Sequence, residues 1–175
     1  MNKLNKLEKL EHILQVFTKR VLPSYLFVKN PKKFMQWQGN ICKQAAILNV
    51  FIIEHILGDE YEVKAFEGFF EHEKLGSYNH CWNYLVHKTD PEKNIICDFT
   101  STISYMDYCT ENDPTLQIKS NDKAVIKSKI DMIGYEEIDI QKETSEPEFY
   151  TGQKTEEIAE ELVYMLTEMK LWEDE

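Results

Sequence analysis

The stretch from Trp37 to Leu57 constrains the fold more than any other part of the chain. A glycine and an asparagine stand just before Cys42, and from this cysteine onward apolar residues recur at helical spacing. They are Ala45, Ala46, Val50, Phe51, Ile53 and Leu57. The pattern predicts a buried helix that begins at Cys42 and ends at Gly58. A thiol at the start of a helix lies near unpaired backbone N–H groups and the positive end of the helix dipole, which favour its thiolate form.

Two predicted strands downstream supply a histidine and a carboxylate. Residues 79–87 are rich in aromatic and branched side chains, so they predict a strand with His80 near its start. Residues 95–100 predict the next strand, which follows a polar hairpin connection. Because side chains alternate along a strand, His80 and Trp82 share one face, and Asp98 lies on one face of the neighbouring strand. We therefore expect the imidazole of His80 and the carboxylate of Asp98 to point the same way.

A thiol, an imidazole and a carboxylate in this order are the nucleophile, the base and the orienting group of a cysteine enzyme. Gly39-x-x-Cys42 before a helix, His80-x-Trp82 on a strand and Asp98-x-Thr100 on the next strand resemble the transglutaminase-like core of the papain-like cysteine enzymes. The resemblance covers residues 37–101 and implies that Cys42, His80 and Asp98 form a catalytic triad. It also implies an α+β fold in which the helix that bears the nucleophile packs on an antiparallel sheet.

The same resemblance suggests how the substrate site is built. Gln36 lies six residues before Cys42, which is the spacing at which papain-type enzymes place the glutamine of the oxyanion hole. Gln38 is the alternative for this role, since transglutaminases build the oxyanion hole differently. We expect Trp37 and Trp82 to line the substrate site beside these residues.

The remaining cysteines and acids near these motifs have structural interpretations. Cys81 and Cys97 neighbour the histidine and the aspartate, so alternation turns them to the opposite face, where we expect buried, small apolar residues. Asp107 is a second acid that could orient His80, but it lacks the strand context of Asp98. The sequence has no C-x-x-C or H-x-x-x-H pair, so we expect no metal site, and no motif implies a cofactor.

Amphipathic helices are predicted at both ends of a single domain that spans residues 1–175. The first is expected at residues 3–20 and to end at Pro23, and the last at residues 155–172. Both are expected to pack on the core at residues 37–101, as additions to the transglutaminase-like fold.

The segments between these elements are less well defined by their sequences. Residues 25–37 are interpreted as a loop, interrupted by Pro31, that forms part of the substrate cleft. Short apolar runs between residues 115 and 140 fit either strands of the same sheet or irregular cover.

The chain is acidic, which limits its possible partners. It carries 31 acidic and 20 basic residues, for a formal net charge of -11. An acidic protein gains nothing from counterion release on nucleic acid and is repelled by anionic membranes, so neither is an expected partner. A peptide or protein substrate is compatible with this charge, and a basic segment fits it best.

The expected location is the cytoplasm. The sequence has no apolar run typical of a secretory signal and none long enough to span a membrane. Export by a route that needs no such signal stays open, and the sequence does not indicate the oligomeric state.

The expected reaction is attack of the Cys42 thiolate on an amide carbonyl to give a thioester, with His80 as base and then acid. Resolution of the thioester by water makes the protein a peptidase or amidase, which is the preferred interpretation. A glutamine deamidase or a transglutaminase is the first alternative, and acyl transfer to another amine is the next. A non-catalytic binding module with a transglutaminase-like fold is the alternative of a different class.

Overall fold

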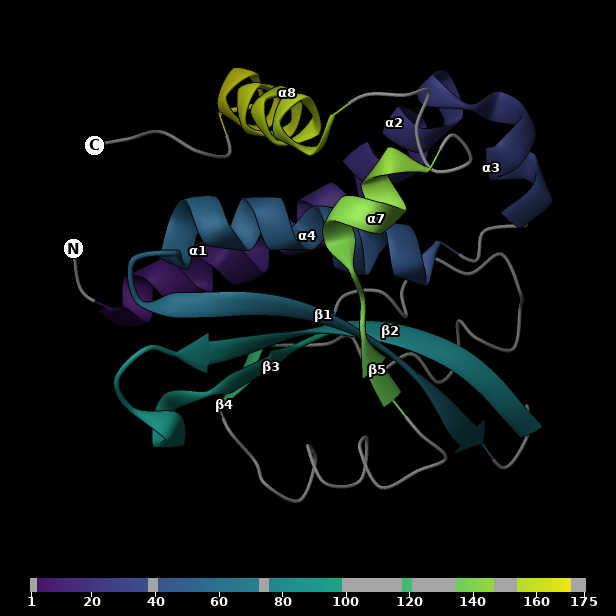
Figure 1. Ribbon diagram of the computed structural model, residues 1–175. Helices are drawn as coiled ribbons and strands as arrows, with labels where there is room; N and C mark the ends of the chain where they lie inside the picture. Colours follow the sequence, from purple (N-terminus) through teal and green to yellow (C-terminus); the bar gives the residue numbers. More distant parts are fainter. Residues whose placement is uncertain are drawn as a thin grey trace.

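A layer of helices covers one face of an antiparallel sheet (Figure 1). The computed structural model describes residues 3–37, 41–72, 76–98, 118–120, 135–146 and 154–170. Within these residues the sheet has five strands in the order β4-β3-β2-β1-β5, and each neighbouring pair is antiparallel. The predicted α+β class and the antiparallel sheet are therefore confirmed.

A long hairpin forms the centre of the sheet. Its strands β1 (Tyr61–His72) and β2 (Gly76–His87) pair with each other along their full lengths. β3 (Ile95–Cys97) pairs with β2, and β4 (Ile118–Ser120) pairs with β3. β5 (Tyr135–Glu137) pairs with the other side of β1. The strands expected at residues 79–87 and 95–100 are thus confirmed as β2 and β3, although β2 begins earlier, at Gly76, and β3 ends at Cys97.

The cysteine-bearing helix lies against this hairpin. α4 (Cys42–Leu57) begins at the predicted cysteine and ends where the N–H of Gly58 donates to the carbonyl of Glu54 at 2.8 Å. It packs on β1 and β2 and is buried on most of its sides, because other helices cover the part that the sheet leaves open. The sheet residues that share its core are Val63, Ala65, Cys81, Leu85, Ile95 and Cys97.

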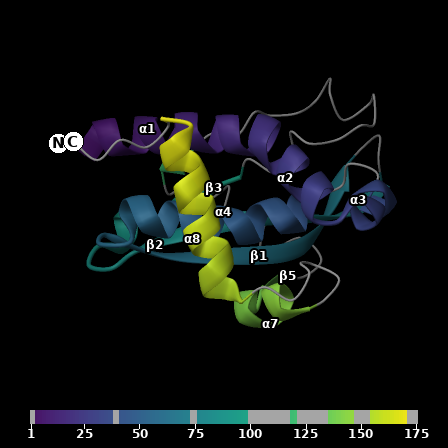
Figure 2. The same ribbon diagram turned by 90° about the horizontal axis from the view of Figure 1, so that it is seen from above.

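Two helices complete the core on the sides of α4 that the sheet leaves open. α1 (Lys3–Val16) lies along α4, and α8 (Thr155–Glu168) crosses over it (Figure 2). The apolar stripes of the two helices are buried at Leu10, Ile13, Leu14, Ile158, Leu162 and Leu166. The predicted helices at the two ends of the domain are confirmed, but α8 ends at Glu168, before the expected residue 172. Its end coincides with a left-handed backbone at Lys170, where φ is 53°.

The prediction that Pro23 ends the first helix is wrong. α1 continues through a π-helical turn, η1 (Phe17–Val21), into α2 (Leu22–Lys29). In the π turn the N–H of Leu22 donates to the carbonyl of Phe17, five residues back. Pro23 falls in the first turn of α2, where a missing N–H and a fixed φ are tolerated, so the chain stays helical.

The interpretation of residues 25–37 as a loop is also wrong, since they form the rest of α2 and then α3 (Pro31–Trp37). Asn30 separates the two helices and accepts the backbone N–H of Lys33 on its Oδ1 at 3.1 Å. Pro31 occupies the first position of α3, where proline favours a helix start. An asparagine followed by a proline is therefore the beginning of a helix here.

Parts of the segment between residues 115 and 146 join the fold as strands and a short helix. β4 and β5 belong to the same sheet as β3 and β1, which answers the open question for these two stretches. α7 (Ile140–Ser145) follows β5 and contacts α8, where the hydroxyls of Thr144 and Thr155 lie 2.6 Å apart. The apolar run at residues 124–126 lies outside the described residues.

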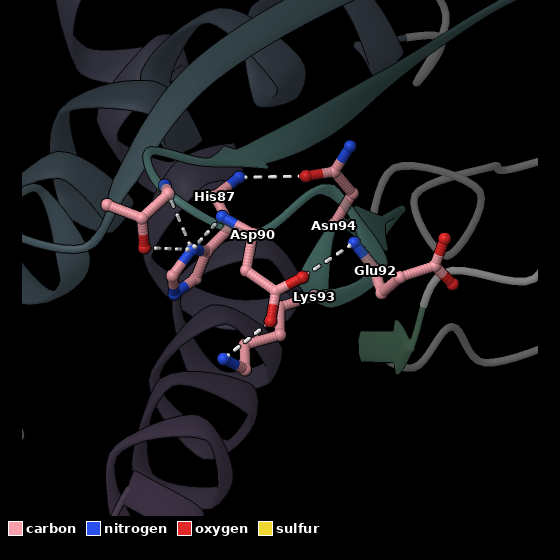
Figure 3. A network of polar contacts seen from close by, with 6 residues as sticks. His87, Asp90, Glu92, Lys93 and Asn94 are labelled. Atoms are coloured by element: carbon pink, nitrogen blue, oxygen red, sulfur yellow. Dashed lines mark hydrogen bonds and ion pairs between the residues drawn. The ribbon is translucent and has the colours of Figure 1, made fainter.

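The turn that joins β2 to β3 is held by a network around His87 (Figure 3). The backbone N–H groups of Thr89 and Asp90 donate to Nδ1 of His87 at 3.3 and 3.1 Å. The N–H of His87 donates to Oδ1 of Asn94 at 2.9 Å. Asp90 also accepts the first free N–H of η2 (Pro91–Lys93) at 3.2 Å. Short-range contacts thus fix the end of the hairpin farther from the start of α4.

Candidate active site

The candidate site lies where the first turn of α4 meets β2 and the end of β3. Cys42 is the first residue of α4, and the preceding Ile41 provides no side-chain cap for the helix. His80 lies within β2, and Asp98 directly follows β3. Three elements that are distant in sequence therefore each contribute one residue of the predicted triad.

His80 and Asp98 form a buried pair. Nε2 of His80 lies 3.0 Å from both carboxylate oxygens of Asp98, and only 8% and 3% of the two residues is exposed. The ring of His80 stacks on Trp82, with centroids 6.5 Å apart and an angle of 23° between the planes. The prediction that the imidazole and the carboxylate point the same way is confirmed. Because the carboxylate holds Nε2–H, Nδ1 is the ring nitrogen left to receive a proton.

The thiol of Cys42 lies against two neighbouring residues of β2. Hydrogen bonds from the Cys81 side chain and then from His80 lower the pKa of Cys42 to about 5, against the opposing effect of burial. The charge of His80 and the backbone N–H of Cys81 act in the same direction. Cys42 itself is partly exposed. A thiolate that is stable at neutral pH and reachable from solvent is the form a nucleophile requires.

Cys81 has a part in this site that the sequence did not indicate. The expectation that Cys81 and Cys97 are buried is confirmed, with exposed fractions of 1% and 0%. However, Cys81 is more than an apolar filler, because its thiol is hydrogen-bonded to Cys42, and this bond and burial raise the pKa of Cys81. Alternation does place Cys81 on the face opposite His80, but α4 lies over that face. A pattern along one strand carries no signal for which helix covers it.

Two contacts hold the start of α4 over the hairpin. The Nδ2 of Asn83, a fully buried residue of β2, donates to the carbonyl of Ala46 at 2.7 Å. Lys43 pairs with Glu67 of β1 at 3.1 Å and with Glu143 of α7 at 2.9 Å. Lys43, the residue after Cys42, is thus held by two carboxylates. Burial has the largest single effect on the pKa of Lys43 and lowers it, but the bonds and charges of the two carboxylates together raise it.

Only one of the two predicted oxyanion residues lies in the described part of the chain, and it makes no described contact with the site. Gln36 lies in α3 with an exposed side chain, and no described contact joins it to Cys42. Trp37 is the last residue of α3, but its side chain lies outside the described part, as does the whole of Gln38. Trp82 does lie at the site, beneath His80, and is 3% exposed. The alternative orienting acid, Asp107, lies outside the described residues.

Metal sites and membrane-spanning helices are both absent from the described part of the chain. Within the described ranges, no group of three or more histidine, cysteine or acidic residues has an arrangement that could hold a metal ion. No helix in these ranges is both long enough and apolar enough to cross a membrane. Comparison of the chain with protein-family models, with curated proteins and with solved structures found no match.

Proposed function

We propose that this protein is a cysteine-dependent hydrolase of peptide or protein amides. The single observation that carries the proposal is the pairing of Nε2 of His80 with both oxygens of Asp98, beside the thiol of Cys42. A histidine oriented by a carboxylate and placed next to a thiol at a helix start is the arrangement that activates a nucleophilic cysteine. The helix packed on an antiparallel sheet is compatible with the proposed transglutaminase-like core.

The proposed reaction begins with a thiolate–imidazolium pair. His80 holds the proton of Cys42 while the thiolate attacks the amide carbonyl, and the negative oxygen is stabilised by backbone N–H groups at the start of α4. Gln36 or Gln38 is the proposed second donor to this oxygen. His80 then gives its proton to the leaving amine, and Asp98 keeps the imidazole in the tautomer that permits both transfers. Water, activated by His80, hydrolyses the thioester.

The proposed substrate is a peptide or protein segment, and a basic one is favoured. The net charge of -11 supports this choice, because it attracts cationic chains at long range. If an amine reached the thioester before water did, the same residues would catalyse transamidation, and if the amide were a glutamine side chain, they would catalyse its deamidation. The proposal commits to hydrolysis, and the products of the reaction distinguish these outcomes.

The test of the proposal is alkylation of the native protein with iodoacetamide between about pH 4 and 9, with the modified cysteine located by mass spectrometry. Since the pKa of Cys42 is lowered to about 5, its thiolate persists as the pH falls, and half of the maximal labelling rate is expected near that pH. His80→Ala should move this midpoint upward. The buried Cys97 is the internal control and should stay unmodified.

The follow-up is a search for acyl-enzyme with a library of basic peptide amides, in which Cys42 acquires the mass of an acyl group and Cys42→Ala does not. Products analysed in isotopically labelled water then distinguish hydrolysis from transfer. Labelling of Cys42 that rises only near about pH 8.5, the ordinary thiol value, would refute the proposal and favour the binding module.

A further inference from the structure

The contact between Cys42 and Cys81 places a second thiol beside the proposed nucleophile. We propose that these two cysteines form an oxidation site, at which a hydroperoxide converts the pair into an intramolecular disulfide. This inference goes beyond the proposed hydrolase activity, because a dithiol can be oxidised whether or not the protein turns over an amide. It rests on three features of the structure: two anchors that fix α4 over the hairpin, and the unequal exposure of the two cysteines.

The first anchor is the hydrogen bond from Asn83 to the carbonyl of Ala46. α4 and β2 run in the same direction across the structure (Figure 1). Cys42 precedes Ala46 by one helical turn, or about 6 Å along the helix. Cys81 precedes Asn83 by two strand residues on the same face, or about 6.6 Å along the strand. Both cysteines therefore lie about the same distance before the contact of Ala46 with Asn83, which places Cys42 over Cys81.

The second anchor is the ion pair between Lys43 and Glu67, with a separation of 3.1 Å. Glu67 is the residue of β1 that lies opposite Cys81 in the sheet register. Lys43, which follows Cys42 in the chain, is thus paired with the residue that lies opposite Cys81 in the sheet. Two independent contacts on different strands agree on the same alignment, and the hydrogen bond between the thiols follows from it.

The two thiols differ in their access to solvent. Cys42 is partly exposed, whereas Cys81 is 1% exposed. An oxidant or an external thiol therefore reaches Cys42 first, and Cys81 can react only with the sulfur of Cys42. The lowered pKa of Cys42 and the raised pKa of Cys81 assign the same roles, with Cys42 as the attacking thiolate and Cys81 as the thiol that reacts second.

The chemistry balances with hydrogen peroxide as the oxidant. The thiolate of Cys42 attacks one peroxide oxygen and breaks the O–O bond, which gives a sulfenic acid, while the departing hydroxide takes a proton from His80 and leaves as water. The sulfur of Cys81 then attacks the sulfenic sulfur, and the displaced hydroxide leaves as water with the Cys81 proton. Two thiols are oxidised to one disulfide, and one peroxide is reduced to two waters.

The disulfide would protect the nucleophile. A sulfenic acid with no neighbouring thiol is open to further oxidation to sulfinic acid, which ordinary thiols do not reverse. A disulfide instead returns to two thiols when a reductant is supplied. Oxidation of this protein is therefore expected to be reversible, and the hidden cysteine is the reason.

The test uses the full chain in a Cys109→Ser background, so that only Cys42, Cys81 and Cys97 remain. After exposure to hydrogen peroxide, the intact protein is expected to lose about 2 Da, and a non-reducing digest should join the peptides of Cys42 and Cys81. Dithiothreitol should restore the original mass. In Cys81→Ser and Cys81→Ala, Cys42 should instead gain about 32 Da and keep that mass in dithiothreitol.

Cys97→Ser is the matched control, because Cys97 is equally buried in the same core but lies on the next strand. It should form the same disulfide as the parent. The inference is overturned if Cys42 is oxidised to sulfinic acid while Cys81 stays a thiol, if Cys81 links to Cys97, or if neither cysteine reacts. These readouts need no substrate, so a disulfide in a protein that hydrolyses no amide would refute the proposed function alone.

Discussion

Two histidines on the same strand, His80 and His87, have opposite surroundings. Nε2 of His80 meets the carboxylate of Asp98, in a buried site beside a thiol. Nδ1 of His87 instead receives backbone N–H groups from Thr89 and Asp90 (Figure 3). A carboxylate accepts a hydrogen bond from an N–H of the ring it contacts, whereas two backbone N–H donors need a lone pair on a ring nitrogen. One histidine is therefore equipped to exchange protons, and the other is fixed as an acceptor in a turn.

The comparison shows that the acid nearest in sequence is not the one that pairs with a histidine in this structure. Asp90 lies three residues from His87, yet its carboxylate caps the short helix η2 and pairs with Lys93 at 2.7 Å. Asp98 is farther from His80 along the chain and comes to it by strand pairing. The proposed triad thus lies toward the end of β2 near which α4 begins, and the other end of β2 enters the turn that leads to β3.

The largest expected difference between the two ends is in turnover. His80→Ala should lower kcat/KM for a peptide amide by at least roughly 10⁵-fold, because the same residue serves as base and acid. His87→Ala should leave kcat/KM within about twofold, since the contacts it removes, in the turn and with the ring of Tyr61, lie away from Cys42. Rates of acyl-enzyme formation and release, followed by mass spectrometry, check both values. Equal losses of kcat/KM in the two variants would show that His80 has no special role in turnover.

Replacement of Asp98 or Asp90 by asparagine tests whether only the carboxylate that pairs with His80 is needed for turnover. Asp98→Asn keeps the shape of the side chain but removes the charge that sets the tautomer of His80, so turnover should fall by roughly 10⁴-fold. Asp90→Asn, the matched change in the turn, should have no effect on turnover. Steady-state kinetics at neutral pH is the measurement, and circular dichroism verifies that both variants are folded. Full activity in Asp98→Asn would exclude Asp98 as the orienting group.

Removal of the buried Cys81 thiol should shift the pH profile of Cys42 labelling, and the effect on the labelling rate should be smaller than the losses of turnover above. The Cys81 hydrogen bond is the largest cause of the lowered pKa of Cys42, so Cys81→Ala should raise the midpoint of iodoacetamide labelling from about 5. A rise of about one unit would slow labelling at that pH about fivefold and leave the rate near pH 9 unchanged. Cys97→Ala is expected to leave the profile alone. An unshifted midpoint in Cys81→Ala would leave His80 as the sole source of activation.

The smallest expected effect is on stability and belongs to the turn. His87→Ala should lower the free energy of unfolding by about 1 kcal/mol, because the acceptor for two backbone N–H groups is lost at a partly exposed site. His87→Asn should recover part of this loss, since its Oδ1 can take the place of Nδ1. Urea unfolding measures both, and Cys42 labelling should be the same in all three proteins.

Much of the site could be predicted because its parts are local patterns. A cysteine before an apolar helix and a histidine near the start of a strand are each visible within ten residues, and alternation gives the direction of His80 and Asp98. The contact of Cys42 with Cys81 could not be predicted this way. It depends on which face of the hairpin α4 covers, and that is decided by the packing of the whole core.

The helices at residues 22–37 show a different limit of the sequence analysis. From the sequence, Pro23 and Pro31 are interpreted as interruptions, although proline is also favoured in the first turn of a helix. The asparagine before Pro31 is the sequence signal for a helix start, and in the structure its Oδ1 accepts the N–H of Lys33. Whether a proline ends a helix or begins one depends here on tertiary packing, because Leu22, Tyr25 and Leu26 are buried against the rest of the protein.

The order in which the chain is made has a consequence for the thiol. Cys42 is synthesised before His80 and Asp98, and its sulfur meets neither His80 nor Cys81 until the hairpin has formed and docked under α4. On an emerging chain it is therefore an ordinary thiol, which is mostly protonated at neutral pH and slow to react. The proposed Cys42 thiolate therefore forms only after folding is complete. In a newly synthesised or misfolded chain, Cys42 is expected to react slowly.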